Sequence, residues 1–240
     1  MIKKSLLLFD MDGTLITSKN PPFYQRNTTR NAIYISVKNQ MRQIAVSYGV
    51  PIDELHGLER MALIWNKTRV YAENQGFSKK TITEMMTAIN EHFTYEETID
   101  HQNLVLLPKT LETLEILQNE GIDLGIVTNA SRGAFDRISN DSDLGSFWKY
   151  FQHSITRDDC YYIKPDPEPI NRILKLFGRS HFVYVGDTDH DAKATRDANG
   201  IFILMNTRGY DRDVIQNMTP YAVIQVLTEL LKIMKKLQEQ

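Results

Sequence analysis

A short apolar run near the start of the chain, which stops at two closely spaced aspartates, constrains the fold more than any other feature. Residues 5–9 form a nearly continuous apolar run, and Asp10-Met11-Asp12-Gly13-Thr14 follows as a polar turn. Such a run is typical of a strand that is buried on both faces, as in a parallel sheet. Further runs of this kind lie at residues 122–127, 182–185 and 201–205, with weaker strand material at 153–155.

Helical patterns lie between these runs. Residues 109–119 and 167–177 carry apolar side chains at helical spacing, and a glycine follows each segment. Strands that alternate with helices predict an α/β fold with a doubly wound, Rossmann-like parallel sheet. Ligands bind such sheets beyond the carboxyl ends of the strands, where the polar residues of this sequence fall. A last helix, over residues 220–237, is expected to cover the sheet.

The segment from residue 17 to residue 101 has a different character. It contains no comparable strand run, and it shows helical patterns at 29–48, 53–74 and 80–93. We therefore expect a discontinuous α/β core domain made of residues 1–16 and 102–240. A helical domain made of residues 17–101 is inserted after the first strand.

Composition excludes several classes of protein. The 240 residues carry a formal net charge of −2, which gives no electrostatic reason to expect nucleic acid or an anionic membrane as a partner. The single cysteine, Cys160, permits no disulfide within the chain and fits a reducing compartment. No stretch approaches the roughly 18 apolar residues of a membrane span. We expect a cytoplasmic protein; the sequence leaves its oligomeric state open.

Asp10 and Asp12 are the first candidates for chemistry. Residues two apart project to the same side of an extended chain, so these two carboxylates converge where the first strand ends. Gly13 lets the chain turn away, and backbone N–H groups of this turn can bind an anion. The alternative is that Asp-x-Asp-Gly is simply a turn.

A second acidic cluster follows the run at residues 182–185. Gly186-Asp187-Thr188 is followed closely by Asp191, and clustered carboxylates suit a hard cation such as Mg²⁺. The alternative is a solvated acidic loop that opens a helix, where aspartate is favoured in any case. An apolar strand that runs directly into the cluster argues against that alternative.

Two further motifs are weak when taken singly. Thr128-Asn129 offers hydroxyl and amide donors at a third strand end, although this pair is common in turns. Lys164 precedes the stiff segment Pro165-Asp166-Pro167, and its ammonium can neutralise phosphate or pair with a carboxylate, although most lysines are simply solvated.

The order of the four motifs along the chain is far more specific. This sequence resembles the haloacid dehalogenase (HAD) superfamily, in its phosphoglycolate phosphatase-like branch, over essentially the whole chain. The resemblance implies a HAD core and makes the helical insertion the cap of this family, which closes over the active edge of the sheet. The motifs that carry it are Asp10-Met11-Asp12-Gly13-Thr14-Leu15, Thr128-Asn129, Lys164-Pro165 and Gly186-Asp187-Thr188 with Asp191.

The resemblance implies a role for each motif residue. Asp10 is the nucleophile that forms an aspartyl-phosphate, and Asp12 protonates the leaving group and then activates water. Thr128 binds the phosphoryl group, and Asn129 helps to shape that site. Lys164 balances the negative charge on Asp10 and the phosphate.

The resemblance also implies a metal cofactor. Mg²⁺ is held by Asp10, by the backbone carbonyl of Asp12 and by Asp187, with Asp191 in support. The implied activity is hydrolysis of a small phosphorylated metabolite. Asp189 and His190, inside the last motif, have no assigned role, and the sequence does not identify the substrate or the cap residues that select it.

Three alternatives stay open at this stage. A sugar phosphomutase, β-phosphoglucomutase-like, uses the same Asp10 and Asp12 pair on the same scaffold. A non-catalytic binding protein keeps the fold, but such a protein is expected to lose Asp10 or Asp187, and this chain has both. Haloalkanoate dehalogenation needs no acid for the leaving halide, so Asp12 argues against it.

Overall fold

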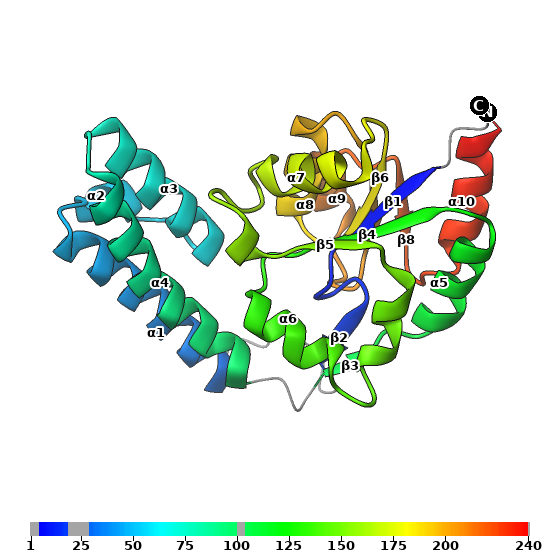
Figure 1. Cartoon of the computed structure of the whole chain (residues 1–240), viewed down its shortest axis with the longest axis horizontal. Helices are drawn as coiled ribbons and strands as arrows, with labels where there is room; N and C mark the ends of the chain where they lie inside the picture. The colour runs from blue at the N-terminus through cyan, green and yellow to red at the C-terminus, as the bar shows by residue number, and fades with distance from the viewer. Residues whose placement is uncertain (1–4, 19–28, 100–103, 240) are drawn as a thin grey trace. The chain divides into compact units, whose positions relative to one another are not determined.

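The computed structural model describes residues 5–18, 29–99 and 104–239 of the chain. The chain divides into two compact units. We call the first, Met1–Lys19 with Leu104–Gln240, the core unit, and the second, Asn20–Asn103, the helical unit. The core unit contains a six-stranded sheet, and the helical unit consists of helices α1 to α4 (Figure 1).

The predicted domain limits differ slightly from these units. The predicted boundary between residues 16 and 17 falls within β2 (Ile16–Ser18), which belongs to the core unit. This strand pairs antiparallel with β3 (Leu104–Leu106), which also belongs to the core unit. The other predicted boundary, between residues 101 and 102, lies outside the described residues, so the limits of the cap stay a prediction.

The main sheet is parallel throughout and has the strand order β5-β4-β1-β6-β7-β8. Its middle strand, β1, pairs on one side with β4 and on the other with β6, so that Leu7 lies between Leu124 and Val183. The strands are β1 (Leu6–Phe9), β4 (Asp123–Val127), β5 (His153–Ile155), β6 (Val183–Gly186), β7 (Ile201–Met205) and β8 (Ala222–Ile224).

Helices cover both faces of this sheet (Figure 1). Alternate strand residues such as Leu7 and Phe9 pack with α5, α6 and α10, whereas Leu6 and Leu8 are buried towards the other face. Because both faces of the sheet are covered, a strand buried in this way needs apolar residues on both of its sides. The predicted doubly wound parallel α/β core is confirmed. One face carries α7 (Glu168–Phe177), α8 (Asp189–Asp197) and α9 (Arg212–Met218), and the other carries α5 (Thr110–Asn119), α6 (Arg132–Ser139) and α10 (Glu229–Gln238).

The end of the chain departs from the prediction. The sequence predicts one helix over residues 220–237, whereas the structure has strand β8 followed by α10. In β8 Ala222 pairs with Ile203 and Ile224 with Met205, so this segment completes the edge of the sheet. Pairing with β7 overrides the helical pattern because it satisfies the backbone groups that β7 would otherwise leave open.

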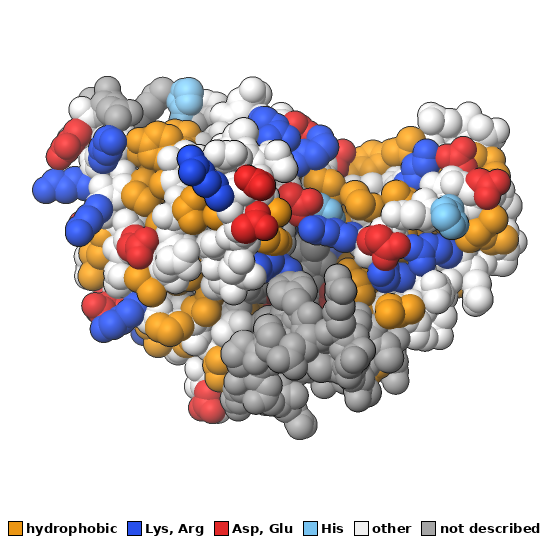
Figure 2. Space-filling model, turned by 180° about the vertical axis from the view of Figure 1, so that it is seen from behind, with side chains coloured by type: hydrophobic (Ala, Val, Ile, Leu, Met, Phe, Trp, Pro, Cys, Tyr) orange, Lys and Arg blue, Asp and Glu red, His pale blue; other side chains and the backbone are white. Residues whose placement is uncertain are grey.

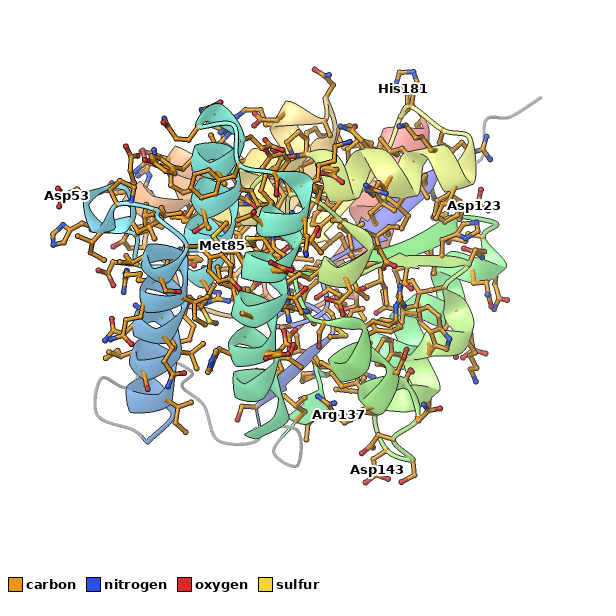
Figure 3. All side chains as sticks on the ribbon, turned by 60° about the vertical axis from the view of Figure 1, so that its left-hand side comes forward. Asp53, Met85, Asp123, Arg137, Asp143 and His181 are labelled. Carbon is orange, nitrogen blue, oxygen red and sulfur yellow. The ribbon has the colours of Figure 1, made fainter. Side chains whose placement is uncertain are left out.

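The helical unit contains α1 (Thr29–Ser47), α2 (Ile52–Leu55), α3 (Met61–Asn74) and α4 (Lys79–Ile99). Helices α1 and α4 pack side by side, and Met85 of α4 is fully buried on the side that faces α1 (Figure 3). The sequence predicts a single helix over residues 53–74. The structure breaks it between α2 and α3, where Gly57 adopts a φ of +75° that a right-handed helix cannot accommodate.

Surface charge is mixed in sign. Basic and acidic side chains are interspersed on the face seen in Figure 2, in keeping with the net charge of −2. Within the described ranges, no helix is both long enough and apolar enough to span a bilayer.

Candidate active site

The carboxyl ends of three neighbouring strands form the candidate site. Asp10 follows β1, Thr128 follows β4 and Asp187 follows β6, and these strands are adjacent in the order β4-β1-β6. Parallel strands end at the same edge of a sheet, so the three residues lie near one another. Asp123 and His181, labelled in Figure 3, mark the amino ends of β4 and β6, on the opposite edge.

A buried lysine connects these strand ends. Lys164 is 2% exposed, and its ammonium donates to Asp10 Oδ1 at 2.8 Å and to Asp191 Oδ1 at 2.6 Å. It also lies 3.0 Å from the carbonyl oxygen of Val127 and 2.8 Å from the Tyr184 hydroxyl. Burial by itself lowers the pKa of an ammonium, but the two carboxylates raise the pKa of Lys164 well above its ordinary value. Lys164 is therefore a fixed positive charge.

The Thr128-Asn129 turn holds the main chain of this lysine in place. The Asn129 side chain donates to the Lys164 carbonyl at 2.8 Å and accepts from the Lys164 N–H at 3.0 Å. The fully buried Arg157 donates from Nη1 to the carbonyl of Asn129 at 2.8 Å. Thr128 is also buried, and its hydroxyl accepts from the N–H of Ala130 at 3.1 Å.

Both carboxylate oxygens of Asp191 have partners. Oδ1 accepts from Lys164 and lies 3.4 Å from the Tyr184 hydroxyl. Oδ2 accepts from the Thr188 hydroxyl and, at 3.0 Å, from the Thr188 N–H. The N–H bond and the bond from the Asp191 N–H to the Thr188 hydroxyl, at 3.3 Å, form the capping box that opens α8. Burial alone raises the pKa of Asp191, but Lys164 and Thr188 together hold it below its ordinary value. Asp191 is an ionised carboxylate already engaged by the protein.

Asp187 is engaged at only one oxygen. Its Oδ2 accepts from the Nε of Arg208, whereas Oδ1 is buried and has no hydrogen-bond partner among the described residues. Burial, together with the charges of Asp10 and Asp191, raises the pKa of Asp187 well above its ordinary range. Gly13 packs directly on this carboxylate: a Cβ on Gly13 would lie 2.2 Å from Asp187 Oδ2.

The three buried acids fit a divalent cation. Asp10, Asp187 and Asp191 each offer a carboxylate oxygen, and these atoms all lie within 4.8 Å of one another. Burial raises the pKa of Asp10 to about 7, although Lys164 acts in the opposite direction. An all-oxygen set suits a hard cation such as Mg²⁺, which takes few protein ligands and keeps several waters. Asp187 Oδ1, which no described residue hydrogen-bonds, is available to such an ion.

Asp12 lies outside this buried cluster. It is exposed, and its charge contributes to the raised pKa of Asp10, so the two carboxylates are close. The turn between them and β2 is closed by the N–H of Leu15, which donates to the carbonyl of Met11 at 2.9 Å, and by Gly13 with a φ of +81°.

The structure thus brings the predicted site residues together. Lys164 hydrogen-bonds Asp10 and Asp191, and the carboxylate of Asp187 lies close to both acids. The remaining predicted residues, Thr128, Asn129 and Asp12, lie at the same strand ends. Sequence reasoning did not single out Tyr184 or Arg157, and it gave Arg208 no role. Tyr184 carried one signal, because a tyrosine inside a buried strand needs a partner for its hydroxyl. Asp189 is exposed and His190 half-buried at the start of α8.

Comparison with known proteins agrees with this geometry. The family model for haloacid dehalogenase-like hydrolases matches residues 4–199. The pyrophosphatase PpaX of Oceanobacillus iheyensis is 26% identical over 230 residues, which cover 95% of this chain and 95% of that protein. The phosphoglycolate phosphatase of Escherichia coli K12 is 25% identical over 234 residues, which cover 93% of this chain and 89% of that protein.

Solved structures share the fold. A hydrolase from Pseudomonas syringae has a TM-score of 0.61 at 18% identity and covers 97% of this chain and 99% of its own. A HAD phosphatase from Thermococcus onnurineus has a TM-score of 0.56 at 22% identity, with 96% and 97% covered. Since the family model spans most of the sequence, the resemblance seen in the motifs is confirmed: this chain belongs to the haloacid dehalogenase-like hydrolases.

Proposed function

We propose that this protein is a magnesium-dependent phosphatase that hydrolyses a small phosphate monoester through an aspartyl-phosphate on Asp10. One observation carries the proposal. The Asp10 carboxylate lies at a strand end, 2.8 Å from a buried ammonium, and one of its oxygens lies within 4.8 Å of a carboxylate oxygen of Asp187. This arrangement supports the assignment of Asp10 as a nucleophile beside a cation-binding site.

The first step transfers the phosphoryl group to the protein. Lys164 engages Oδ1 of Asp10, which leaves Oδ2 to attack phosphorus. An Oδ2–P bond forms, the bond from phosphorus to the leaving oxygen breaks, and Asp12 gives its proton to that oxygen. The exposed position of Asp12 supports this role, since an acid that serves the leaving group must reach the substrate.

The second step releases phosphate. Asp12, now ionised, takes a proton from a water molecule whose oxygen attacks phosphorus. The Oδ2–P bond breaks, and the Asp10 carboxylate and the proton on Asp12 are restored. General acid–base catalysis of this kind contributes about 10²–10⁴-fold to the rate.

Fixed charges make these steps feasible. Asp10, the main-chain carbonyl of Asp12 and Asp187 would hold the magnesium, with Asp191 in support. The ion supplies positive charge that lets a carboxylate approach a phosphate dianion. Lys164 adds a second positive charge, and Thr128 donates its hydroxyl to the phosphoryl oxygens while Asn129 keeps Lys164 in place.

The relatives support the class of substrate. The names of PpaX and of the Escherichia coli enzyme refer to pyrophosphate and phosphoglycolate, which are both small phosphorylated anions. We propose a substrate of that size and charge, with the helical unit as the cap that selects it.

The test is phosphate release from a panel of small substrates: pyrophosphate, phosphoglycolate, nucleoside monophosphates and sugar phosphates. Activity should disappear with a chelator and return with Mg²⁺. Asp10→Asn should abolish turnover, whereas Asp213→Asn, which removes an exposed acid of α9, should not change it. Turnover of any panel member by Asp10→Asn at the wild-type rate would exclude the covalent mechanism.

A further inference from the structure

The loop that follows β7 reaches back to the acidic cluster. The Thr207 hydroxyl donates to the carbonyl of Gly13 at 2.7 Å, and the Nε of Arg208 donates to Asp187 Oδ2. The loop is held in shape by Asn206, whose side chain accepts from the Tyr210 N–H at 2.8 Å and donates to the Tyr210 carbonyl at 3.2 Å. The hydrogen bonds of Asn206 therefore stabilise the turn that places the Arg208 guanidinium against Asp187.

Because of this contact, the two oxygens of the Asp187 carboxylate have different surroundings. Oδ2 is held by Arg208 and covered by Gly13, whereas Oδ1 is buried and receives no hydrogen bond from the part of the chain that the structure describes. Asp10 has a similar arrangement, because Lys164 holds its Oδ1. In each of these acids a cationic side chain fixes one oxygen, and at Asp187 the other oxygen is left for a ligand.

We infer that Arg208 is a positioning residue for the metal site: its guanidinium fixes the Asp187 carboxylate so that Oδ1 is presented to the cation. The inference rests on the proposed metal-dependent function and adds a residue to it. Hydrogen bonds to a metal-ligating carboxylate orient it, and their loss typically lowers metal affinity about 10–100-fold. The planar fork of arginine suits such orientation better than the flexible ammonium of lysine.

Positioning and charge predict opposite outcomes, which makes the inference testable. The positive charge of Arg208 repels a bound cation, so its removal should strengthen metal binding if charge alone matters. Loss of orientation should weaken binding instead. The direction of the change in affinity therefore identifies the role of Arg208.

The experiment measures Mn²⁺ affinity by electron paramagnetic resonance in the chelator-treated 240-residue chain, without any substrate. Mn²⁺ has the same preference for oxygen ligands as Mg²⁺. We expect Arg208→Met to weaken binding about 10–100-fold. The matched control is Arg212→Met, which removes the same charge from an exposed position a few residues away and should leave the affinity unchanged. Equal or tighter binding by Arg208→Met overturns the inference.

Two more variants separate the possible failures. Asp187→Asn should abolish Mn²⁺ binding; wild-type affinity in that variant would contradict the proposed metal site itself. Loss of binding in Asp187→Asn with unchanged affinity in Arg208→Met would contradict only the role of Arg208. If Arg208→Met does not fold, as judged by circular dichroism, Arg208→Lys decides: affinity below wild type supports positioning, and wild-type or tighter affinity overturns it.

Discussion

The Lys164 ammonium lies 2.8 Å from Asp10 Oδ1, and both side chains are buried. The same ammonium bonds Asp191 at 2.6 Å, so one cation is shared by two carboxylates at the ends of different strands. Without Lys164, these two buried carboxylates would repel one another. This relationship links the stability of the fold to the chemistry of the site.

The first prediction concerns this shared cation. Lys164→Met should lower the free energy of unfolding by about 3–5 kcal/mol, because removal of one member of a buried ion pair leaves uncompensated charge. Urea denaturation measures the change. Lys175→Met, which removes an exposed lysine of α7, should change the free energy by no more than about 0.5 kcal/mol. Equal stability of the two variants would contradict the role of Lys164.

The second prediction is a pH dependence of metal binding. Burial raises the pKa of Asp10 to about 7, against the effect of Lys164, so the metal-free site holds a proton below that pH. Cations bind the carboxylate form, and metal binding must then displace this proton. Affinity for Mg²⁺ should therefore fall as the pH drops through 7 to 6.

Calorimetric titration with Mg²⁺ at pH 6, 7 and 8 tests this expectation. Heats measured in two buffers of different ionisation enthalpy should also reveal proton release at pH 6. An affinity that stays constant from pH 6 to pH 8 would show that Asp10 is already ionised in the metal-free protein.

The third prediction concerns Gly13. Gly13→Ala places a Cβ 2.2 Å from Asp187 Oδ2 at a φ of +81°, so the new methyl group must displace the carboxylate. Both metal affinity and turnover should be lost. Gly178→Ala is the control, because Gly178 has a φ of +61° and no atom of the described residues lies within 4 Å of its added Cβ. That variant should lose about 1 kcal/mol of stability from strain and keep its metal affinity.

A comparison of metal affinity with thermal stability in the two alanine variants provides the check. Loss of affinity in both would point to backbone strain in general. Loss of affinity in Gly13→Ala alone would identify the contact with Asp187 as the cause.

Much of the core could be predicted from the sequence because its strands are buried on both faces. Continuous apolar runs identified β1, β4, β6 and β7, and each polar residue after a run then had to lie at one edge of the sheet. The pairing of Lys164 with Asp10 could not be deduced in this way. The two residues are 154 positions apart, and only the resemblance to a known family connected them.

Other features depend on tertiary contacts that leave little trace in the sequence. Strand β8 has three residues at the edge of the sheet, and its apolar side chains also fit a helical pattern. The contact between Arg208 and Asp187 depends on the direction of a loop, which Asn206 sets through two hydrogen bonds to Tyr210. Neither spacing nor composition reveals such a direction.

The last prediction separates hydrolysis from phosphoryl transfer between sugar hydroxyls. A phosphatase and a phosphomutase both need Asp10 as nucleophile and Asp12 as acid and base, and they differ in what attacks the aspartyl-phosphate. A mutase must bring a sugar hydroxyl to phosphorus and keep water inactive, which requires several groups that bind the sugar. Water needs no such groups, and the relatives compared above carry the names of phosphatases and pyrophosphatases, so we expect water to be the acceptor.

The measurement is incubation with Mg²⁺ and β-glucose 1-phosphate, primed with a trace of glucose 1,6-bisphosphate. Free phosphate and glucose 6-phosphate are quantified in parallel, and Asp10→Asn serves as the control for both. We expect phosphate release from at least one member of the substrate panel and no glucose 6-phosphate. Rapid formation of glucose 6-phosphate with little free phosphate would instead identify a mutase, because the aspartyl-phosphate would then be passing its phosphoryl group to the sugar in preference to water.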